Sequence, residues 1–149
     1  MKTEKITTSA AQTRKLGELL AAEILKTENR KEAIIVGLDG NLGSGKTTFT
    51  QGFAKGLGIR KKILSPTFVI VKRFDISSGF FSDLYHIDCY RVENGKCLSD
   101  LGFKEIIANP EHVVVIEWVK RIRRILPKKI ILIDFMHVER NKRKIVIRY

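Results

Sequence analysis

Residues 33–58 read AIIVGLDGNLGSGKTTFTQGFAKGLG, and this stretch decides the fold. It opens with an apolar run over 33–38, which is typical of a strand buried inside a parallel sheet. A glycine-rich segment comes next, followed by a helical pattern over 46–56 that ends where Gly56 and Gly58 supply stop signals. The order of strand, glycine-rich loop and helix predicts an α/β protein with its functional loop directly after a buried strand.

The glycine-rich segment, residues 40–47, matches the phosphate-binding pattern G-x-x-x-x-G-K-[ST] in full. Its glycines allow backbone N–H groups to turn toward an anion, and the N-terminus of the following helix adds a partial positive charge. Lys46 can reach the β- and γ-phosphates of a nucleotide, and the Thr47 hydroxyl can ligate magnesium. We therefore predict ATP and Mg²⁺ as ligands. The predicted contacts along this segment are Asn41, Leu42, Gly43, Ser44, Gly45, Lys46, Thr47 and Thr48.

A phosphate-binding loop of this kind needs an acidic group at the end of a neighbouring strand to hold the metal. Glu117 directly follows the apolar run 113–116, and it is the first candidate. Asp88 ends the stretch 85–88 and is the second candidate, for the metal or for catalysis. The alternative for each is an exposed carboxylate paired with a lysine or arginine. Trp118, the single tryptophan, is predicted to contact the nucleotide, while core packing is equally typical of this residue type.

Two weaker signals lie between these motifs. Thr67 belongs to a Ser-Pro-Thr stretch before an expected strand, where a switch segment can sense the γ-phosphate, so it is predicted to act in catalysis. An ordinary turn is the alternative. His86 carries no specific signal by itself, and a surface or core histidine is the default interpretation.

Helices and strands alternate along the rest of the chain. A capping box at Ser9 and Gln12 predicts the start of a helix, and its apolar stripe consists of Leu16, Leu20 and Ile24. The other predicted elements are strands over 67–74, 80–87, 113–116, 129–135 and 144–148, a turn at 77–79, and a helix over 98–108 with Leu101 and Ile106 facing inward. These elements predict a P-loop NTPase-like α/β fold, a three-layer sandwich around a mixed central sheet.

The length and composition fit one globular domain over residues 1–149. Apolar residues make up 44% of the chain, and no apolar run approaches the roughly 20 residues that a bilayer requires. Cys89 and Cys97 show no CxxC or metal-type spacing. We expect a cytoplasmic protein in a reducing compartment, with no membrane contact.

The charge is unusual, because Lys and Arg number 28 against 16 Asp and Glu, which gives a net charge of +12. A field of this sign attracts polyanions and speeds their association, so nucleic acid is one expected partner. The alternative is a basic face that contacts only solvent. Two other functions stay open on these features: a nucleotide-gated RNA-binding module, and a small-molecule or nucleoside kinase whose arginine-rich lid would be residues 120–124.

Several stretches together resemble the bacterial TsaE family of tRNA threonylcarbamoyladenosine biosynthesis proteins, which are P-loop ATPases. They are, in the order of the family, GNLGSGKTTFTQGFAKGLGI (40–59), SPTF (65–68), HIDCYR (86–91), LGFKEII (101–107) and EW (117–118). The phosphate-binding loop is shared by very many families. The SPTF stretch, the H-x-D-x-Y-R string and the EW pair are together specific, and the resemblance covers about residues 8–135.

The resemblance implies ATP hydrolysis that supports TsaD- and TsaB-type partners, which transfer a threonylcarbamoyl group to an adenosine of tRNA. It implies contact with tRNA through that complex. The family's functional positions fall on Gly43, Gly45, Lys46, Thr47, Glu117 and Asp88, with Thr67 in the switch-like segment. Two positions depart from the family pattern: Asn41 stands where Asp is more usual, and Val119 stands where Pro is usual.

Overall fold

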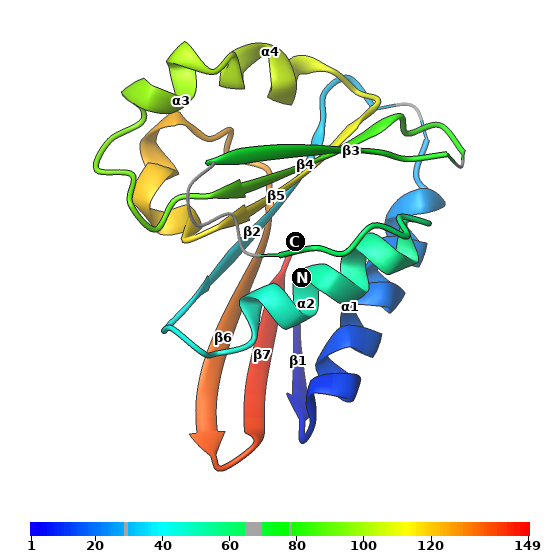
Figure 1. Ribbon diagram of the computed structural model, residues 1–149, viewed down its shortest axis with the longest axis vertical. Helices are drawn as coiled ribbons and strands as arrows, with labels where there is room; N and C mark the ends of the chain where they lie inside the picture. Colours follow the sequence, from blue (N-terminus) through cyan, green and yellow to red (C-terminus); the bar gives the residue numbers. More distant parts are fainter. Residues whose placement is uncertain (29, 65–69, 78) are drawn as a thin grey trace.

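The computed structural model of the protein describes residues 1–28, 30–64, 70–77 and 79–149. Its centre is a seven-stranded sheet with the strand order β1-β7-β6-β2-β5-β4-β3 (Figure 1). The strands are β1 (Lys2–Thr7), β2 (Ile34–Gly40), β3 (Val71–Asp75), β4 (Asp83–Asp88), β5 (His112–Glu117), β6 (Ile131–Glu139) and β7 (Lys142–Arg148). The helices are α1 (Ala10–Leu25), α2 (Lys46–Gly56), α3 (Lys96–Asp100) and α4 (Phe103–Ala108), together with a 3₁₀ segment, η1 (Val119–Ile125).

The sheet is mixed, as predicted. Strands β6, β2, β5 and β4 run parallel in its middle, while β1 and β7 on one side and β3 on the other pair antiparallel with their neighbours. The parallel strands therefore place their carboxyl ends at one edge of the sheet, where open α/β sheets bind ligands. The chain ends lie side by side, because the Tyr149 N–H donates to the Met1 carbonyl at 3.0 Å.

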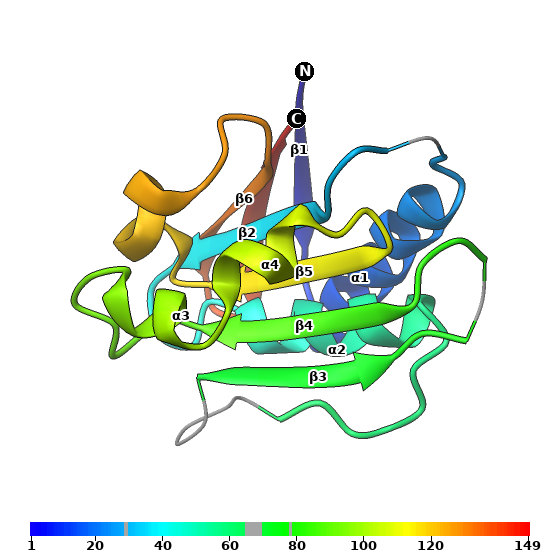
Figure 2. The same ribbon diagram turned by 90° about the horizontal axis from the view of Figure 1, so that it is seen from above.

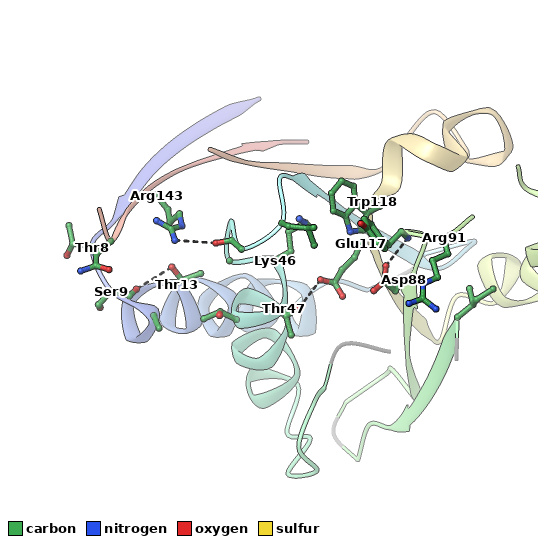
Figure 3. A pocket seen from close by; sticks show the side chains of 18 residues that line it. Thr8, Ser9, Thr13, Lys46, Thr47, Asp88, Arg91, Glu117, Trp118 and Arg143 are labelled. Carbon is green, nitrogen blue, oxygen red and sulfur yellow. Dashed lines mark hydrogen bonds between the residues drawn. The ribbon is translucent and has the colours of Figure 1, made fainter. Parts of the chain in front are cut away.

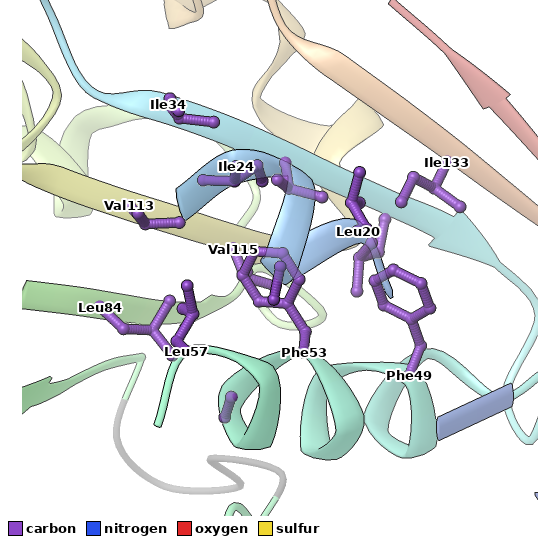
Figure 4. Packing of buried hydrophobic residues seen from close by; sticks show 14 of the residues in the cluster. Leu20, Ile24, Ile34, Phe49, Phe53, Leu57, Leu84, Val113, Val115 and Ile133 are labelled. Atoms are coloured by element: carbon purple, nitrogen blue, oxygen red, sulfur yellow. The ribbon is translucent and has the colours of Figure 1, made fainter. Parts of the chain in front are cut away.

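Helices cover both faces of the sheet, which confirms the predicted three-layer arrangement. Helices α1 and α2 lie on one face, and α3, α4 and η1 lie on the other (Figures 1 and 2). Along the central strands, side chains alternate between the two hydrophobic clusters. On β5, Val113 and Val115 face α1 and α2 (Figure 4), whereas Val114 and Ile116 pack against the opposite layer.

The contact between α1 and α2 fixes the position of the glycine-rich loop, because α2 begins where the loop ends. The two helices approach backbone to backbone: a Cβ atom on Gly52 would lie 1.9 Å from the Arg14 carbonyl oxygen. Such an approach is open only to glycine. Helix α1 begins with the predicted cap, since the Ser9 hydroxyl accepts from the Gln12 N–H at 3.2 Å.

Some predicted elements are wrong in detail. The helix over 98–108 is broken into α3 and α4 at Gly102, where φ is +78°, and Leu101 is 52% exposed rather than inward, although Ile106 is buried as predicted. Strand β1 and segment η1 were not predicted. Residues 67–69 of the strand predicted over 67–74 lie outside the described residues, and β3 begins at Val71. The described part of the chain contains no helix whose length and apolar character would suit a bilayer span.

Candidate functional site

The glycine-rich loop lies between the carboxyl end of β2 and the N-terminus of α2, as predicted (Figure 3). Gly45, the residue before α2, has a φ of +105°, in the left-handed region that glycine adopts far more readily than other residues. This turn brings the N-terminus of α2 to a pocket of about 820 Å³. The pocket is lined by the loop, the start of α1, the ends of β4 and β5, and the β6–β7 turn.

Lys46, the first residue of α2, is only 6% exposed. Its ammonium donates to the Gly40 carbonyl and, at 2.9 Å, to the Asn41 carbonyl, and it lies 4.3 Å from the centre of the Trp118 ring. Burial lowers the pKa of Lys46 from its ordinary value, while nearby carboxylates, led by that of Glu117, act in the opposite direction. A cation that is already partly desolvated binds an incoming phosphate with less loss of hydration.

Glu117 ends β5 and lies in the buried gap between that strand and α2, with 2% exposure. Both of its carboxylate oxygens are engaged. The Thr47 hydroxyl donates to Oε1 at 3.1 Å, and the His86 Nε2 atom lies 2.8 Å from Oε2. The alternative of an exposed carboxylate paired with a surface cation is therefore wrong for Glu117.

Asp88 lies beside Glu117, because the two residues are register partners at the carboxyl ends of β4 and β5. Its Oδ1 accepts from the Tyr90 N–H at 2.9 Å, and its side chain lines the pocket (Figure 3). Trp118 adopts a left-handed backbone conformation with φ of +59°, and its ring lies 5.1 Å from that of Tyr90. The ring thus covers the Lys46 side of the pocket while also packing on a neighbour.

The opposite end of the pocket is built from the start of α1 and from β7, and its residues were not predicted to belong to the site. Thr8, Ser9 and Thr13 line it from the start of α1. Arg143 lines it from β7 and donates to the Gly43 carbonyl at 3.2 Å. No binding motif marks these residues, and the capping box at Ser9 predicts only a helix start, because β1 and β7 bring them to the loop only when the sheet is assembled.

Most of the predicted site residues line one pocket. They are Leu42, Gly43, Gly45, Lys46, Thr47, Thr48, Asp88, Glu117 and Trp118. Asn41 and Ser44 are not among the lining residues; the Asn41 carbonyl accepts from the Lys46 ammonium at 2.9 Å and the Ser44 hydroxyl at 3.4 Å. Thr67 lies outside the described residues. His86, which opens the H-x-D-x-Y-R string but was given no role from the sequence, lies in direct contact with Glu117.

The donor set at the carboxyl end of the sheet suits a hard cation that also binds phosphate. Within the described residues, no three His, Cys, Asp or Glu side chains form a ready-made metal cluster. Oxygen donors that line the pocket at this end include the Thr47 hydroxyl and the carboxylates of Glu117 and Asp88. Magnesium is usually held by one or two carboxylates together with waters and substrate phosphates, so these residues fit it.

The basic run 120–124 is part of η1, a packed element at the edge of the pocket. Val119 and Ile122 bury η1 against the sheet. The Lys120 ammonium lies 2.8 Å from the Asp39 carboxylate and 3.2 Å from the Asp134 carboxylate. The hydrogen bonds to Asp39 and then Asp134 raise the pKa of Lys120. Lys120 therefore ties η1 to β2 and, through Asp134, to β6.

Comparison with known proteins assigns this architecture to a family. The model of the family described as threonylcarbamoyl adenosine biosynthesis protein TsaE matches residues 7–145. The tRNA threonylcarbamoyladenosine biosynthesis protein TsaE of Haemophilus influenzae is 36% identical over 122 residues, which cover 80% of this chain and 75% of that protein. The protein of the same name from Bacillus subtilis is 39% identical over 115 residues, covering 77% and 69%.

A solved structure agrees with these relatives. The crystal structure of Bacillus subtilis YdiB aligns with a TM-score of 0.77 and 31% sequence identity, and the alignment covers 99% of this chain and 84% of that chain. The fold, the phosphate-binding loop and the extent of the family match all indicate the same family. The chain therefore belongs to the TsaE family of tRNA threonylcarbamoyladenosine biosynthesis proteins.

Proposed function

We propose that this protein binds ATP with magnesium and hydrolyses it to ADP and phosphate, as the ATPase component of tRNA threonylcarbamoyladenosine biosynthesis. The observation that carries the proposal is the convergence of Lys46, Thr47 and Glu117 at the N-terminus of α2, with the Thr47 hydroxyl 3.1 Å from Glu117 Oε1. A cation, a hydroxyl and a carboxylate beside free helix N–H groups are what a nucleoside triphosphate and its metal require.

The residues at the two ends of the pocket differ, and they support one orientation of the bound nucleotide. The phosphates would lie on the loop, with the γ-phosphate toward Glu117 and Asp88 and the α-phosphate toward Thr48 (Figure 3). The ribose and base would then extend toward the end of the pocket formed by Thr13 and Arg143. Hydroxyl and guanidinium groups at that end offer hydrogen bonds to a sugar or a base.

Thr47 and Glu117 would hold the magnesium ion, directly or through water. The Thr47 O–H already donates to Glu117, so the lone pairs of its oxygen stay available for the metal. When bound, magnesium would neutralise charge on the β- and γ-phosphates. The hydrogen bond between Thr47 and Glu117 is therefore compatible with metal binding.

Hydrolysis would proceed by attack of water on the γ-phosphorus. The new P–O bond forms as the bond from that phosphorus to the β–γ bridging oxygen breaks, ADP leaves with the electron pair, and the proton of the water passes to solvent. Lys46 and the loop N–H groups would stabilise the charge on the phosphate oxygens. Asp88, beside Glu117, would orient the attacking water or the hydration shell of the metal.

We further propose that the ATPase cycle supports TsaD- and TsaB-type partners and that tRNA is met through their complex. The support is family membership, since the relatives carry the name of the tRNA modification. Slow hydrolysis by the isolated protein is expected, because P-loop enzymes commonly receive a stabilising arginine or an ordered switch from a partner.

The test is ATP hydrolysis by the purified protein, alone and with a TsaD–TsaB pair and tRNA, with Glu117→Gln as the inactive control. We expect slow magnesium-dependent phosphate release that the partners stimulate and that the control lacks. Absence of stimulation and of stable association would remove the partner assignment. Release of phosphate by Glu117→Gln at the wild-type rate would overturn the site, and RNA binding without any hydrolysis would favour a binding module instead.

A further inference from the structure

His86 is a buried titratable side chain that the proposed mechanism leaves without a role. It is fully buried in β4, and its Nε2 atom lies 2.8 Å from Glu117 Oε2. The contact crosses from β4 to β5, because His86 is the register partner of Val115, two residues before Glu117. The imidazole therefore contacts Oε2 of the Glu117 carboxylate, while Oε1 accepts the hydrogen bond from Thr47.

Strand alternation explains why this histidine reaches the site. Leu84 and Val115 both pack in the cluster beneath α1 and α2. Positions two residues further along each strand face the same way, which places His86 and Glu117 on the face that α2 covers. Three side chains from three elements, α2, β5 and β4, thus form one continuous chain of contacts from Thr47 through Glu117 to His86.

The ring nitrogens of His86 have unequal surroundings. Among the described residues, the buried Nδ1 atom has no hydrogen-bond partner, whereas Nε2 faces a carboxylate oxygen. A buried N–H without an acceptor is costlier than a buried lone pair, so the proton belongs on Nε2, where it can donate to Glu117. The imidazole then acts as a fixed donor that holds one oxygen of the carboxylate.

We propose that His86 is a positioning residue that fixes the rotamer of Glu117 and thereby aims its Oε1 at Thr47 and the magnesium position. This inference rests on the proposed function. With one oxygen held by His86, the carboxylate presents the other to the Thr47 hydroxyl in a single orientation. Side chains that hydrogen-bond to metal-binding groups typically change metal affinity or activity by about 10–100-fold when they are removed.

A matched control lies at the other end of the same two strands. His112, at the start of β5, also sits beside a carboxylate, with its Nε2 atom 3.6 Å from Asp83 Oδ2. Its Nδ1 atom lies 2.8 Å from the Ile106 carbonyl, and no residue of the glycine-rich loop contacts this pair within the described contacts. Substitution of His112 therefore measures what loss of a buried histidine–carboxylate contact does to the fold alone.

The experiment compares His86→Met, which removes the donor, with His86→Gln, whose amide can donate from near the Nε2 position, and with His112→Met. Calorimetry measures the affinity for a non-hydrolysable ATP analogue with and without magnesium, and urea unfolding reports stability. We expect His86→Met to lose about 10–100-fold of the magnesium-dependent gain in affinity while metal-free affinity stays close to wild type. His86→Gln should recover most of that gain, and His112→Met should retain all of it.

Wild-type magnesium coupling in folded His86→Met, or a Gln variant no better than the Met variant, would overturn the positioning role. If His86→Met fails to fold, His86→Asn replaces it, because the shorter amide is polar but cannot reach Glu117. Equal coupling in the Asn and Gln variants would then contradict the proposal. Failure of the wild-type protein to bind the analogue at all would instead refute the proposed function, so the two failures are distinguishable.

Discussion

Two histidine–carboxylate pairs join the parallel strands β4 and β5, one at each end, and they differ in what surrounds them. At the amino ends, Asp83 is held by His112 and, at 2.6 Å, by Arg73 of β3. At the carboxyl ends, Glu117 is held by His86 and by Thr47 of the glycine-rich loop. The first pair connects structural elements to each other, while the second connects the sheet to the pocket.

The direction of the strands accounts for this difference. The carboxyl ends of parallel strands open onto the loops that bind ligands, whereas their amino ends lead back into connecting segments. The two pairs also lie on opposite faces of the sheet. His86 has the same strand parity as Leu84, which packs beneath α1 and α2, whereas His112 has the opposite parity to Val113 and so faces the other layer. The same side-chain chemistry thus serves stability at one end and, in our proposal, catalysis at the other.

Substitution of Glu117 should have the largest effect, and it should affect ATP hydrolysis far more than stability. Glu117→Gln keeps the shape of the side chain but removes the charge that the metal and Thr47 require. We expect ATP hydrolysis to fall by about 100-fold or more, while the free energy of unfolding stays within about 1 kcal/mol of wild type. Phosphate release and urea titration measure the two quantities. A large loss of stability with normal hydrolysis would show that the pair at the carboxyl ends of β4 and β5 serves the fold and not the reaction.

The amino-end pair should respond in the opposite way. Asp83→Asn removes a buried charge that His112 and Arg73 both face, so unfolding should become easier by about 1–3 kcal/mol. The hydrolysis rate at saturating ATP should not change, because the partners of Asp83 among the described residues, Arg73, Ser82 and His112, do not line the pocket. Denaturant unfolding and steady-state kinetics on the same preparation test this. A reduced rate in a fully folded variant would show that the amino end also serves the reaction.

A smaller effect is expected at a third group of carboxylates near the pocket. Asp39 and Asp134 are register partners on β2 and β6, and Lys120 reaches both, at 2.8 and 3.2 Å. Because Lys120 is 60% exposed, its removal in Lys120→Ala should cost only about 0.2–1 kcal/mol of stability, and less at high salt. Unfolding at two salt concentrations checks this. A salt-independent loss would mean that Lys120 acts through packing.

The smallest effect concerns the thiol that follows Asp88. Cys89 is fully buried, and burial raises its pKa to about 12, whereas Cys97 is partly exposed. At pH 8 iodoacetamide should label Cys97 first, since only the thiolate reacts, and labelling of Cys89 should rise with pH toward its pKa. Binding of magnesium and ATP should slow the labelling of Cys89 further, because the ligands stabilise the end of β4. Peptide mass spectrometry follows each site, and equal labelling rates would contradict the buried environment.

The sequence predicted the parts of the fold and site that depend on local pattern. The apolar run before Gly40 and the helix after Gly45 lie where expected, because a buried strand and a phosphate-binding loop each have a strong local signature. The place of Glu117 at the end of a buried strand was predicted for the same reason, and its role stays a prediction. These residues need no knowledge of which strands are neighbours.

The residues that were missed depend on strand pairing. His86 meets Glu117 only because β4 lies parallel to β5 in one register, and Arg143 reaches Gly43 only through the assembled sheet. Two features of the sequence pointed to His86: it opens the H-x-D-x-Y-R string, and the period-two alternation of a strand places it on the same face as Asp88. Leu101 was misplaced because the helical pattern over 98–108 hid the break at Gly102.

Nucleotide binding on the glycine-rich loop is tested by calorimetric ATP binding to Lys46→Ala in the presence of magnesium, with Lys55→Ala as the control. Both lysines belong to α2, but Lys46 is buried against the loop, while the Lys55 side chain is 76% exposed and pairs with Glu18. We predict that Lys46→Ala binds ATP at least about 100-fold more weakly than wild type and that Lys55→Ala binds it normally. Wild-type affinity in folded Lys46→Ala would contradict the account.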